Sequence, residues 1–241
     1  MASEPLAGSA SRRVAMISGA NRGIGAAVAK ALADAGWALS LGVRDPSRLA
    51  LALGGAPVLA CRYDARDRLG ETAWVGETVA AFGRVDAIVA NAGIMIPKTV
   101  VEAADEDLDA LLEVNVHAPL RHVRAAWPWL SASGNGRVVT IVSLSGKRVK
   151  SAGSGLYAVS KFAALALTHA VRHAGWDAGV RATAICPGFV ATDMAAALAP
   201  RPAAEMTQPD DLARIVAFVL DLPNTASVAE IPINSTLEDM L

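Results

Sequence analysis

The sequence has few cysteines, almost no net charge and no long apolar run. Its two cysteines, Cys61 and Cys186, lie far apart at the ends of apolar stretches, which predicts buried thiols in a reducing compartment and no disulfide. A formal net charge of -1 leaves no basic surface for nucleic acid or for an anionic membrane. We therefore expect small-molecule partners, no nucleic acid and no membrane.

The sequence also lacks the patterns typical of a membrane-spanning helix, a signal peptide and a metal site. No run of about 18 uncharged apolar residues occurs, so no membrane-spanning helix is predicted. Residues 1–11 contain no apolar core of signal-peptide length, and we expect them to form a flexible tail on a cytoplasmic protein. No Cys and His cluster has the spacing of metal ligands, so no metal site is predicted.

The chain is instead rich in apolar residues, arranged in alternating short and long segments. Hydrophobic residues make up 53% of the 241 residues, enough for one large core in a single domain over residues 12–241. Short apolar runs alternate with helical segments, which predicts an α/β fold with a doubly wound parallel sheet of about seven strands and helices on both faces. The strands are expected at 13–18, 37–43, 57–61, 85–90, 137–142, 180–186 and 230–234, and the longer helices at 26–35, 102–130, 157–176 and 208–222.

A glycine-rich segment, GANRGIG at residues 19–25, connects the first predicted strand to the first predicted helix. Glycines in such a turn let backbone N–H groups and the positive end of the helix approach a phosphate closely. The spacing G-x-x-x-G-x-G differs from the commoner G-x-G-x-x-G dinucleotide pattern. The segment therefore indicates a phosphate site, with a tight turn that binds no ligand as the alternative.

The end of the second predicted strand carries a positive charge. In a nucleotide-binding parallel sheet an acidic residue at this place accepts hydrogen bonds from a ribose 2′-hydroxyl, but here Val43 is followed by Arg44. Arg44 suits a 2′-phosphate, and Arg22 in the glycine-rich segment can supply a second cation. The alternative is a surface ion pair between Arg44 and Asp45.

Polar residues follow or interrupt several of the other predicted elements. Asp64 after the third strand contacts an adenine or caps the next helix. Asn115, in the interior of an apolar helix, is a site residue or is explained by packing. The fifth strand ends at Ser143 and Ser145, where a hydroxyl can hold a carbonyl oxygen or cap the following helix. Asn91-Ala92-Gly93, after the fourth strand, leaves room for a ligand.

Tyr157 and Lys161 are four residues apart on a predicted helix, so their side chains share one face. A lysine beside a tyrosine favours the phenolate and lowers the pKa of the phenol, which makes it a usable proton donor and acceptor. The alternative is a half-buried tyrosine with a solvated lysine.

The segment at about 189–206, after the sixth strand, is rich in alanine and proline with an apolar stripe. We expect it to form a flap over an apolar pocket. Lys147, Arg148 and Lys150 follow the fifth strand and attract an anionic substrate or belong to a solvated loop.

Together these motifs resemble the short-chain dehydrogenase/reductase family, in order and approximate spacing, from about Arg12 to Asn234. The resemblance implies a Rossmann-type dinucleotide-binding domain. It also implies that Tyr157 is the acid and base, that Lys161 lowers its pKa and binds the nicotinamide ribose, that Ser143 polarises the substrate oxygen, and that Asn115 holds a relay water. Ser143 lies 14 residues before Tyr157, one more than in many members, so the part played by Ser145 stays open.

The resemblance also implies the cofactor contacts. The pyrophosphate side is assigned to Gly19, Arg22, Gly23, Ile24 and Gly25, the adenine to Asp64, the ribose region to Asn91 and Gly93, and the carboxamide to Thr192. Arg44 resembles NADP-preferring members. Further contacts are expected from Asn21, Ala92, Tyr157, Lys161, Pro187, Gly188 and Val190.

We therefore expect an oxidoreductase that prefers NADP(H), accepts NAD(H), and transfers hydride reversibly between the nicotinamide and a ketone, aldehyde or secondary alcohol of small to medium, fairly apolar character. The alternatives are an NAD-dependent alcohol dehydrogenase and a non-catalytic NADP-binding sensor. The resemblance further implies a homo-oligomer, dimer or tetramer, built on the helices near 105–130 and 157–176. The C-terminal residues 236–241 lack the family's usual glycine-rich sequence, which leaves the oligomer contacts open.

Overall fold

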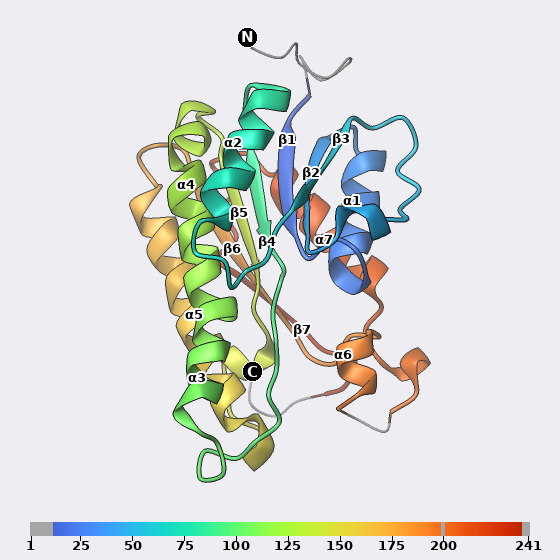
Figure 1. Ribbon diagram of the computed structural model, residues 1–241, viewed down its shortest axis with the longest axis vertical. Helices are drawn as coiled ribbons and strands as arrows, with labels where there is room; N and C mark the ends of the chain where they lie inside the picture. Colours follow the sequence, from blue (N-terminus) through green and yellow to red (C-terminus); the bar gives the residue numbers. More distant parts are fainter. Residues whose placement is uncertain (1–11, 199–200, 238–241) are drawn as a thin grey trace.

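The computed structural model describes residues 12–198 and 201–237 and contains a parallel sheet of seven strands in the order β3-β2-β1-β4-β5-β6-β7 (Figure 1). The predicted fold class is confirmed. The order reverses between β1 and β4, and ligands of open parallel sheets bind at the carboxyl end of such a switch point. The strands are β1 Val14–Ser18, β2 Ala38–Val43, β3 Val58–Arg62, β4 Ala87–Ala90, β5 Arg137–Ile141, β6 Arg181–Pro187 and β7 Glu230–Ile233.

Helices cover both faces of the sheet. On one face α1 packs against α7, and on the other lie α2, α4 and α5 (Figure 1). All residues of β1, β2 and β4 are buried, as a sheet covered on both faces requires. The α-helices are α1 Gly23–Asp34, α2 Gly70–Phe82, α3 Asp105–Leu112, α4 Ala118–Ala132, α5 Gly155–Ala174, α6 Asp193–Ala196 and α7 Pro209–Asp221.

The segment at 102–130, expected to be mostly helical, is helical from Asp105 to Ala132 with one irregularity. A π-helical turn, η2 at Glu113–His117, separates α3 from α4 and contains Asn115. Such turns insert one residue into a helix and occur frequently at functional sites. Pro128 lies inside α4 without ending it.

The segment predicted to be a flap, residues 189–206, begins after β6 and contains α6 and the short 3-10 turn η5 Ala203–Glu205. Val190 forms an isolated parallel bridge with Thr207, which brings the two ends of the segment together. Residues 199–200, and the predicted tail at 1–11, lie outside the described residues. Cys61 and Cys186 are buried, as predicted. None of the described helices is both long and apolar enough to cross a membrane.

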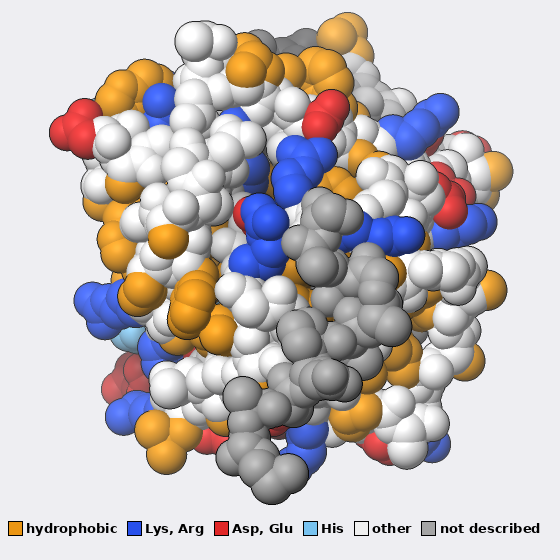
Figure 2. All heavy atoms as spheres, turned by 90° about the horizontal axis from the view of Figure 1, so that it is seen from above, with side chains coloured by type: hydrophobic (Ala, Val, Ile, Leu, Met, Phe, Trp, Pro, Cys, Tyr) orange, Lys and Arg blue, Asp and Glu red, His pale blue; other side chains and the backbone are white. Residues whose placement is uncertain are grey.

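Basic side chains gather at the end of the molecule where the strands begin, which Figure 2 shows from above. Arg13 precedes β1, and Arg137 and Arg181 begin β5 and β6. Arg137 is buried and donates to Asn224 Oδ1 at 2.8 Å, and burial together with Arg181 and Arg13 lowers the pKa of its guanidinium to about 10. These arginines therefore join the loops at this end of the sheet.

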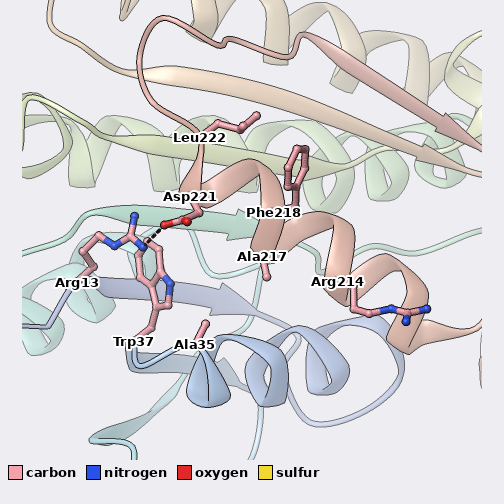
Figure 3. Close-up of a pocket in the computed structure, with 8 residues that line it drawn as sticks. All are labelled: Arg13, Ala35, Trp37, Arg214, Ala217, Phe218, Asp221 and Leu222. Atoms are coloured by element: carbon pink, nitrogen blue, oxygen red, sulfur yellow. Dashed lines mark hydrogen bonds and ion pairs between the residues drawn. The ribbon is translucent and has the colours of Figure 1, made fainter.

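A hollow of about 420 Å³ lies at the same end, between α1 and α7 (Figure 3). Arg13 lies 4.2 Å above the Trp37 ring and donates to Asp221 Oδ1 at 2.7 Å on its wall. Ligands of open parallel sheets bind at the opposite, carboxyl end of the strands, so this hollow lies away from the edge expected to hold the functional site.

Candidate active site

Ser143, Tyr157 and Lys161 converge at the carboxyl end of β5. Ser143 follows the strand closely, whereas Tyr157 and Lys161 lie in the first two turns of α5. Tyr157 hydrogen-bonds to the Ser143 side chain. The Lys161 ammonium donates to the Ile141 carbonyl at 3.0 Å and lies 5.6 Å from the centre of the Tyr157 ring. Lys161 is only 6% exposed, so the alternative of a solvated lysine is wrong.

The protonation of this pair differs from the sequence-based expectation. Burial raises the pKa of Tyr157 to about 12, and only its hydrogen bond to Ser143 acts in the opposite direction. Burial also lowers the pKa of Lys161 to about 8. Lys161 is not among the groups that lower the pKa of Tyr157 in this structure, where loss of solvent around the phenol has the largest effect.

The two candidate serines have different environments. The Ser143 hydroxyl accepts a hydrogen bond from the backbone N–H of Ser145 at 3.0 Å, which caps the 3-10 turn η3 Leu144–Gly146. Ser143 therefore contacts Tyr157 and also orders the turn that follows it. Of the two serines, Ser143 is the one whose hydroxyl is directed to the Tyr157 phenol.

Asn115 is 2% exposed, and its side-chain amide is used within the protein. Its Nδ2 donates to the Ile94 carbonyl at 3.0 Å and to Ser160 Oγ at 2.9 Å, and its Oδ1 accepts from the Ile94 N–H at 3.0 Å. The packing explanation thus accounts for the side chain, and Asn115 joins the loop after β4 to α5. Sequence reasoning missed Ser160, although a hydroxyl directly before Lys161 on the same helix is a visible signal.

The amino end of α1 suits a phosphate. Arg22 is the N-cap residue but makes no side-chain capping bond, and the first turn of α1 contains no acidic residue. The first backbone N–H groups of this 12-residue helix are therefore left for an anion at the carboxyl edge of β1. Gly19 and Gly23 have φ angles of +67° and +55°, which favour glycine. A Cβ on Gly25 would lie 2.4 Å from the Gly19 carbonyl oxygen.

Asn91 and Ser18 hold the glycine-rich turn against the end of β4. The Ser18 hydroxyl accepts from the backbone N–H groups of Asn91 and Ala92, both at 3.0 Å. The Asn91 side chain donates to the carbonyls of Ser18 at 2.9 Å and Gly19 at 3.2 Å. Sequence reasoning did not select Ser18 as a site residue, and its hydroxyl at the end of a buried strand is the signal that could have found it.

Arg44 and Asp64 lie on the exposed rim beyond β2 and β3. Asp45 accepts a hydrogen bond from Ser47 and pairs with Arg48 at 3.9 Å, so the alternative of an Arg44 and Asp45 pair is not seen. Asp64 Oδ1 accepts from the backbone N–H of Arg66 at 3.0 Å. It caps this turn and not α2, which begins at Gly70.

The residues after β6 contact the glycine-rich turn. Thr192 caps α6 through Oγ1, and its Cγ2 lies 3.1 Å from the place of a Cβ on Gly23. A Cβ on Gly188 would lie 2.5 Å from Asn234 Oδ1, so the chain is closely packed where it leaves β6. The structure thus brings the sequence-predicted contacts to one edge of the sheet: Gly19, Asn21, Arg22, Gly23, Ile24 and Gly25 after β1, Asn91, Ala92 and Gly93 after β4, and Pro187, Gly188, Val190 and Thr192 at and after β6.

Basic and apolar residues surround the loops beside Ser143. Lys147 pairs with Glu230 at 2.5 Å, and Glu230 contacts His169 at 2.7 Å, so Lys147 is engaged within the protein. A groove of about 640 Å³ lies between the loops after β4 and β5, and its exposed apolar side chains are Val100, Val101 and Val149. Lys150 also lines this groove.

Known proteins resemble this chain over most of its length. The sequence model of the family described as short chain dehydrogenase matches residues 13–203. An agropine synthesis reductase of Rhizobium rhizogenes is 40% identical over 218 residues, which are 89% of this chain and 50% of that protein. The chain therefore spans about half the length of the agropine synthesis reductases that it matches.

Solved structures share the fold closely. An alcohol dehydrogenase from the archaeon Thermococcus sibiricus, complexed with 5-hydroxy-NADP, superposes with a TM-score of 0.85 at 31% identity, over 93% of this chain and 97% of that one. A short chain dehydrogenase from Burkholderia cenocepacia in complex with NADP gives a TM-score of 0.84 at 30% identity, over 94% and 98%. With the family match, these likenesses show that the chain belongs to the short-chain dehydrogenase family.

Proposed function

We propose that the protein is an NADPH-preferring carbonyl reductase or alcohol dehydrogenase that acts on a small to medium, fairly apolar ketone, aldehyde or secondary alcohol. The observation that carries the proposal is the convergence of Ser143, Tyr157 and Lys161 at the carboxyl end of β5, on the same edge of the sheet as the glycine-rich turn. In this arrangement the serine hydroxyl can hydrogen-bond to a substrate carbonyl oxygen, and the phenol beside the lysine can donate a proton to it.

The chain's residues fit a dinucleotide at this edge. The uncapped amino end of α1 and the close packing at Gly25 leave backbone N–H groups for the pyrophosphate, with Asn91 keeping the turn in place. Lys161 and Tyr157 would hold the nicotinamide ribose, and Thr192 the carboxamide. When bound, the nicotinamide supplies or accepts the hydride.

The protein's own part in the reaction is to orient the substrate and to move a proton. The Ser143 hydroxyl donates to the substrate oxygen. The Tyr157 phenol gives that oxygen a proton in reduction, and the Tyr157 phenolate takes a proton from it in oxidation. The high pKa of Tyr157, about 12, keeps the phenol protonated at neutral pH, as a proton donor requires. Lys161, with a pKa of about 8, can hold or release a proton close to neutral pH. It can therefore return a proton to the Tyr157 phenolate.

The preference for NADPH rests on the rim beyond β2. Arg44 is exposed and forms no ion pair with the residues that the structure describes, so its guanidinium is available for a 2′-phosphate. The NADP complexes among the structural neighbours support this assignment. An NAD-dependent dehydrogenase, with Arg44 as a surface residue only, is the second candidate.

The preference for an apolar substrate rests on the loops around Ser143. Val100, Val101 and Val149 are exposed beside this edge, and the predicted flap adds Phe189 and Met194, which are 41% and 42% exposed. Such a lining binds hydrocarbon groups by removing them from water.

We further propose a cytoplasmic homo-oligomer, dimer or tetramer. On α4 and α5 the large apolar side chains of Trp129, Val159 and Phe162 are 38%, 50% and 44% exposed, which favours an interface between copies of the chain. Size-exclusion chromatography with light scattering tests this proposal.

The function is tested by titrating the purified protein with NADPH and with NADH, and then following nicotinamide absorbance while ketones and aldehydes of graded size are added. Tighter binding of NADPH, followed by its oxidation with apolar carbonyls, is the expected result. Equal affinity for both cofactors would support the NAD-dependent candidate. Tight binding without turnover by any carbonyl would contradict the enzyme and support a sensor.

A further inference from the structure

The glycine-rich turn and the predicted flap are joined by an ion pair between residues far apart in the sequence. The Arg22 guanidinium lies 2.6 Å from the carboxylate of Asp193, the first residue of α6. The methyl group of Thr192 lies against Gly23, at 3.1 Å from the place of a Cβ. The start of α6 therefore rests on the first turn of α1 through one polar and one apolar contact.

The ion pair is exposed, with 64% of the Arg22 side chain and 74% of the Asp193 side chain in contact with solvent. Water screens such a pair strongly, so the carboxylate is held weakly. A phosphate group carries more negative charge than a carboxylate and offers three acceptor oxygens to a guanidinium. A phosphate that reaches Arg22 can therefore displace Asp193.

Resting on the function proposed above, we propose that Asp193 is a specificity-determining residue that competes with the 2′-phosphate of NADP(H) for Arg22. NAD(H) lacks the 2′-phosphate, and its pyrophosphate is proposed to bind the backbone N–H groups at the amino end of α1 and not the Arg22 guanidinium, so the ion pair stays intact. The cost of breaking the pair falls on NADP(H) alone, so Asp193 reduces the preference for this cofactor. Its displacement also releases the start of α6 from the turn, which couples the identity of the cofactor to the position of the predicted flap.

Asp193 has another possible use, as an acidic residue in the first turn of α6. Negative charge there interacts favourably with the amino end of a helix. The hydroxyl of Thr192 already accepts from the Ala195 N–H at 3.4 Å, so the cap is present without Asp193. A helix-capping role predicts no difference between the two cofactors, whereas competition for Arg22 predicts one.

The test compares Asp193→Asn with the wild-type protein by fluorescence titration of NADPH and NADH. Removal of the competing charge should tighten NADPH binding about two- to five-fold, the range expected for an exposed ion pair, and leave NADH binding unchanged. In an Arg22→Ala background the same change should have no effect on NADPH. The matched control is Glu205→Gln, which removes a carboxylate from the same segment that pairs with Arg201 at 3.7 Å.

A second measurement follows the segment itself by hydrogen exchange of peptides that cover residues 189–206. In the wild-type protein, exchange at residues 193–197 should be faster with NADPH than with NADH, because only NADPH releases Asp193. In Asp193→Asn the two cofactors should give the same exchange.

Failure of the competition and failure of the proposed function give different results. If the wild-type protein binds neither cofactor, the proposed function is wrong. If the wild-type protein binds NADPH and reduces carbonyls, but Asp193→Asn has the same affinities for NADPH and NADH as Glu205→Gln, only the proposed competition for Arg22 is wrong. Equal tightening of NADPH and NADH in Asp193→Asn would also contradict it.

Discussion

The side-chain amide of Asn115 donates a hydrogen bond of 2.9 Å to the hydroxyl oxygen of Ser160, the residue directly before Lys161 in α5. The Ser160 hydroxyl in turn donates to the carbonyl of Tyr157 at 2.8 Å. Because Asn115 also bonds to both backbone groups of Ile94, one amide fixes the π-helical turn, the loop after β4 and the helix of the candidate acid to one another. The chemistry proposed for Tyr157 and Lys161 thus depends on a residue that has no free side-chain donor of its own.

Tyr157→Phe should leave NADPH affinity nearly unchanged and reduce turnover about 100- to 10,000-fold, the usual contribution of a positioned acid. The phenol ring and its packing remain, and only the hydroxyl that bonds to Ser143 is lost. Fluorescence titration and nicotinamide absorbance measure the two quantities on one preparation. Near-normal rates in this variant would place the proton donor elsewhere.

Arg44→Asp should weaken NADPH binding by about ten-fold or more, because a charge-assisted hydrogen bond is replaced by repulsion between the new carboxylate and the phosphate. NADH affinity should change little. Arg48→Asp is the matched control, since Arg48 is close in sequence and 84% exposed but pairs with Asp45. The assignment of Arg44 to the phosphate fails if both variants affect NADPH equally.

The sequence was sufficient to predict what depends on local pattern. Buried strands, the glycine-rich turn and the four-residue spacing of Tyr157 and Lys161 all follow from periodicity and backbone geometry. Their order along the chain then predicted a doubly wound parallel sheet, which the strand order confirms.

What the sequence could not predict depends on contacts between distant segments. The π-helical turn at Asn115 accompanies hydrogen bonds to Ile94 and Ser160, which no local pattern encodes. The pair of Arg22 and Asp193 joins residues 171 positions apart. The sequence places a positive charge beside Tyr157, which favours a lower pKa, whereas the burial that raises this pKa appears only in the folded chain.

Lys161→Met should raise the free energy of unfolding at pH 7 while it abolishes turnover. Burial lowers the pKa of Lys161 to about 8 from an ordinary value of 10.5, so the folded state binds this proton less tightly than the unfolded state does. Below pH 8 both states carry the proton and the folded state bears the full cost of burying the charge. Above pH 10.5 both are neutral and the cost is gone.

The wild-type protein should therefore gain stability relative to Lys161→Met as the pH rises from 8 to 10.5. At pH 7 the variant is expected to be more stable by about 1–3 kcal/mol, less any loss from the unpaired Ile141 carbonyl. Urea unfolding of both proteins at several pH values measures the difference. If the difference in the free energy of unfolding between the two proteins stays constant from pH 8 to 10.5, burial does not lower the pKa of Lys161.

Gly25→Ala should disrupt the phosphate turn more than its single added methyl group suggests. The new Cβ would lie 2.4 Å from the Gly19 carbonyl oxygen, which is backbone, and 2.6 Å from Asn91 Nδ2, which hydrogen bonds to the Ser18 and Gly19 carbonyls hold in place. Either α1 must move away from β1 or the bonds from Asn91 to the turn must break, and both changes displace the N–H groups proposed to hold the pyrophosphate. We expect a loss of stability of about 1–3 kcal/mol, as for other overpacked sites, together with weaker binding of NADPH and NADH alike.

Gly76→Ala separates this effect from the general consequence of replacing a glycine in a helix. Gly76 lies within α2, and a Cβ there meets nothing within 4 Å. Its replacement should raise the free energy of unfolding by about 0.5–1 kcal/mol, because alanine loses less conformational freedom on folding, and should leave both cofactors bound as before. If Gly25→Ala also unfolds at higher urea and binds NADPH normally, the packing between the glycine-rich turn and Asn91 does not determine the geometry of the site.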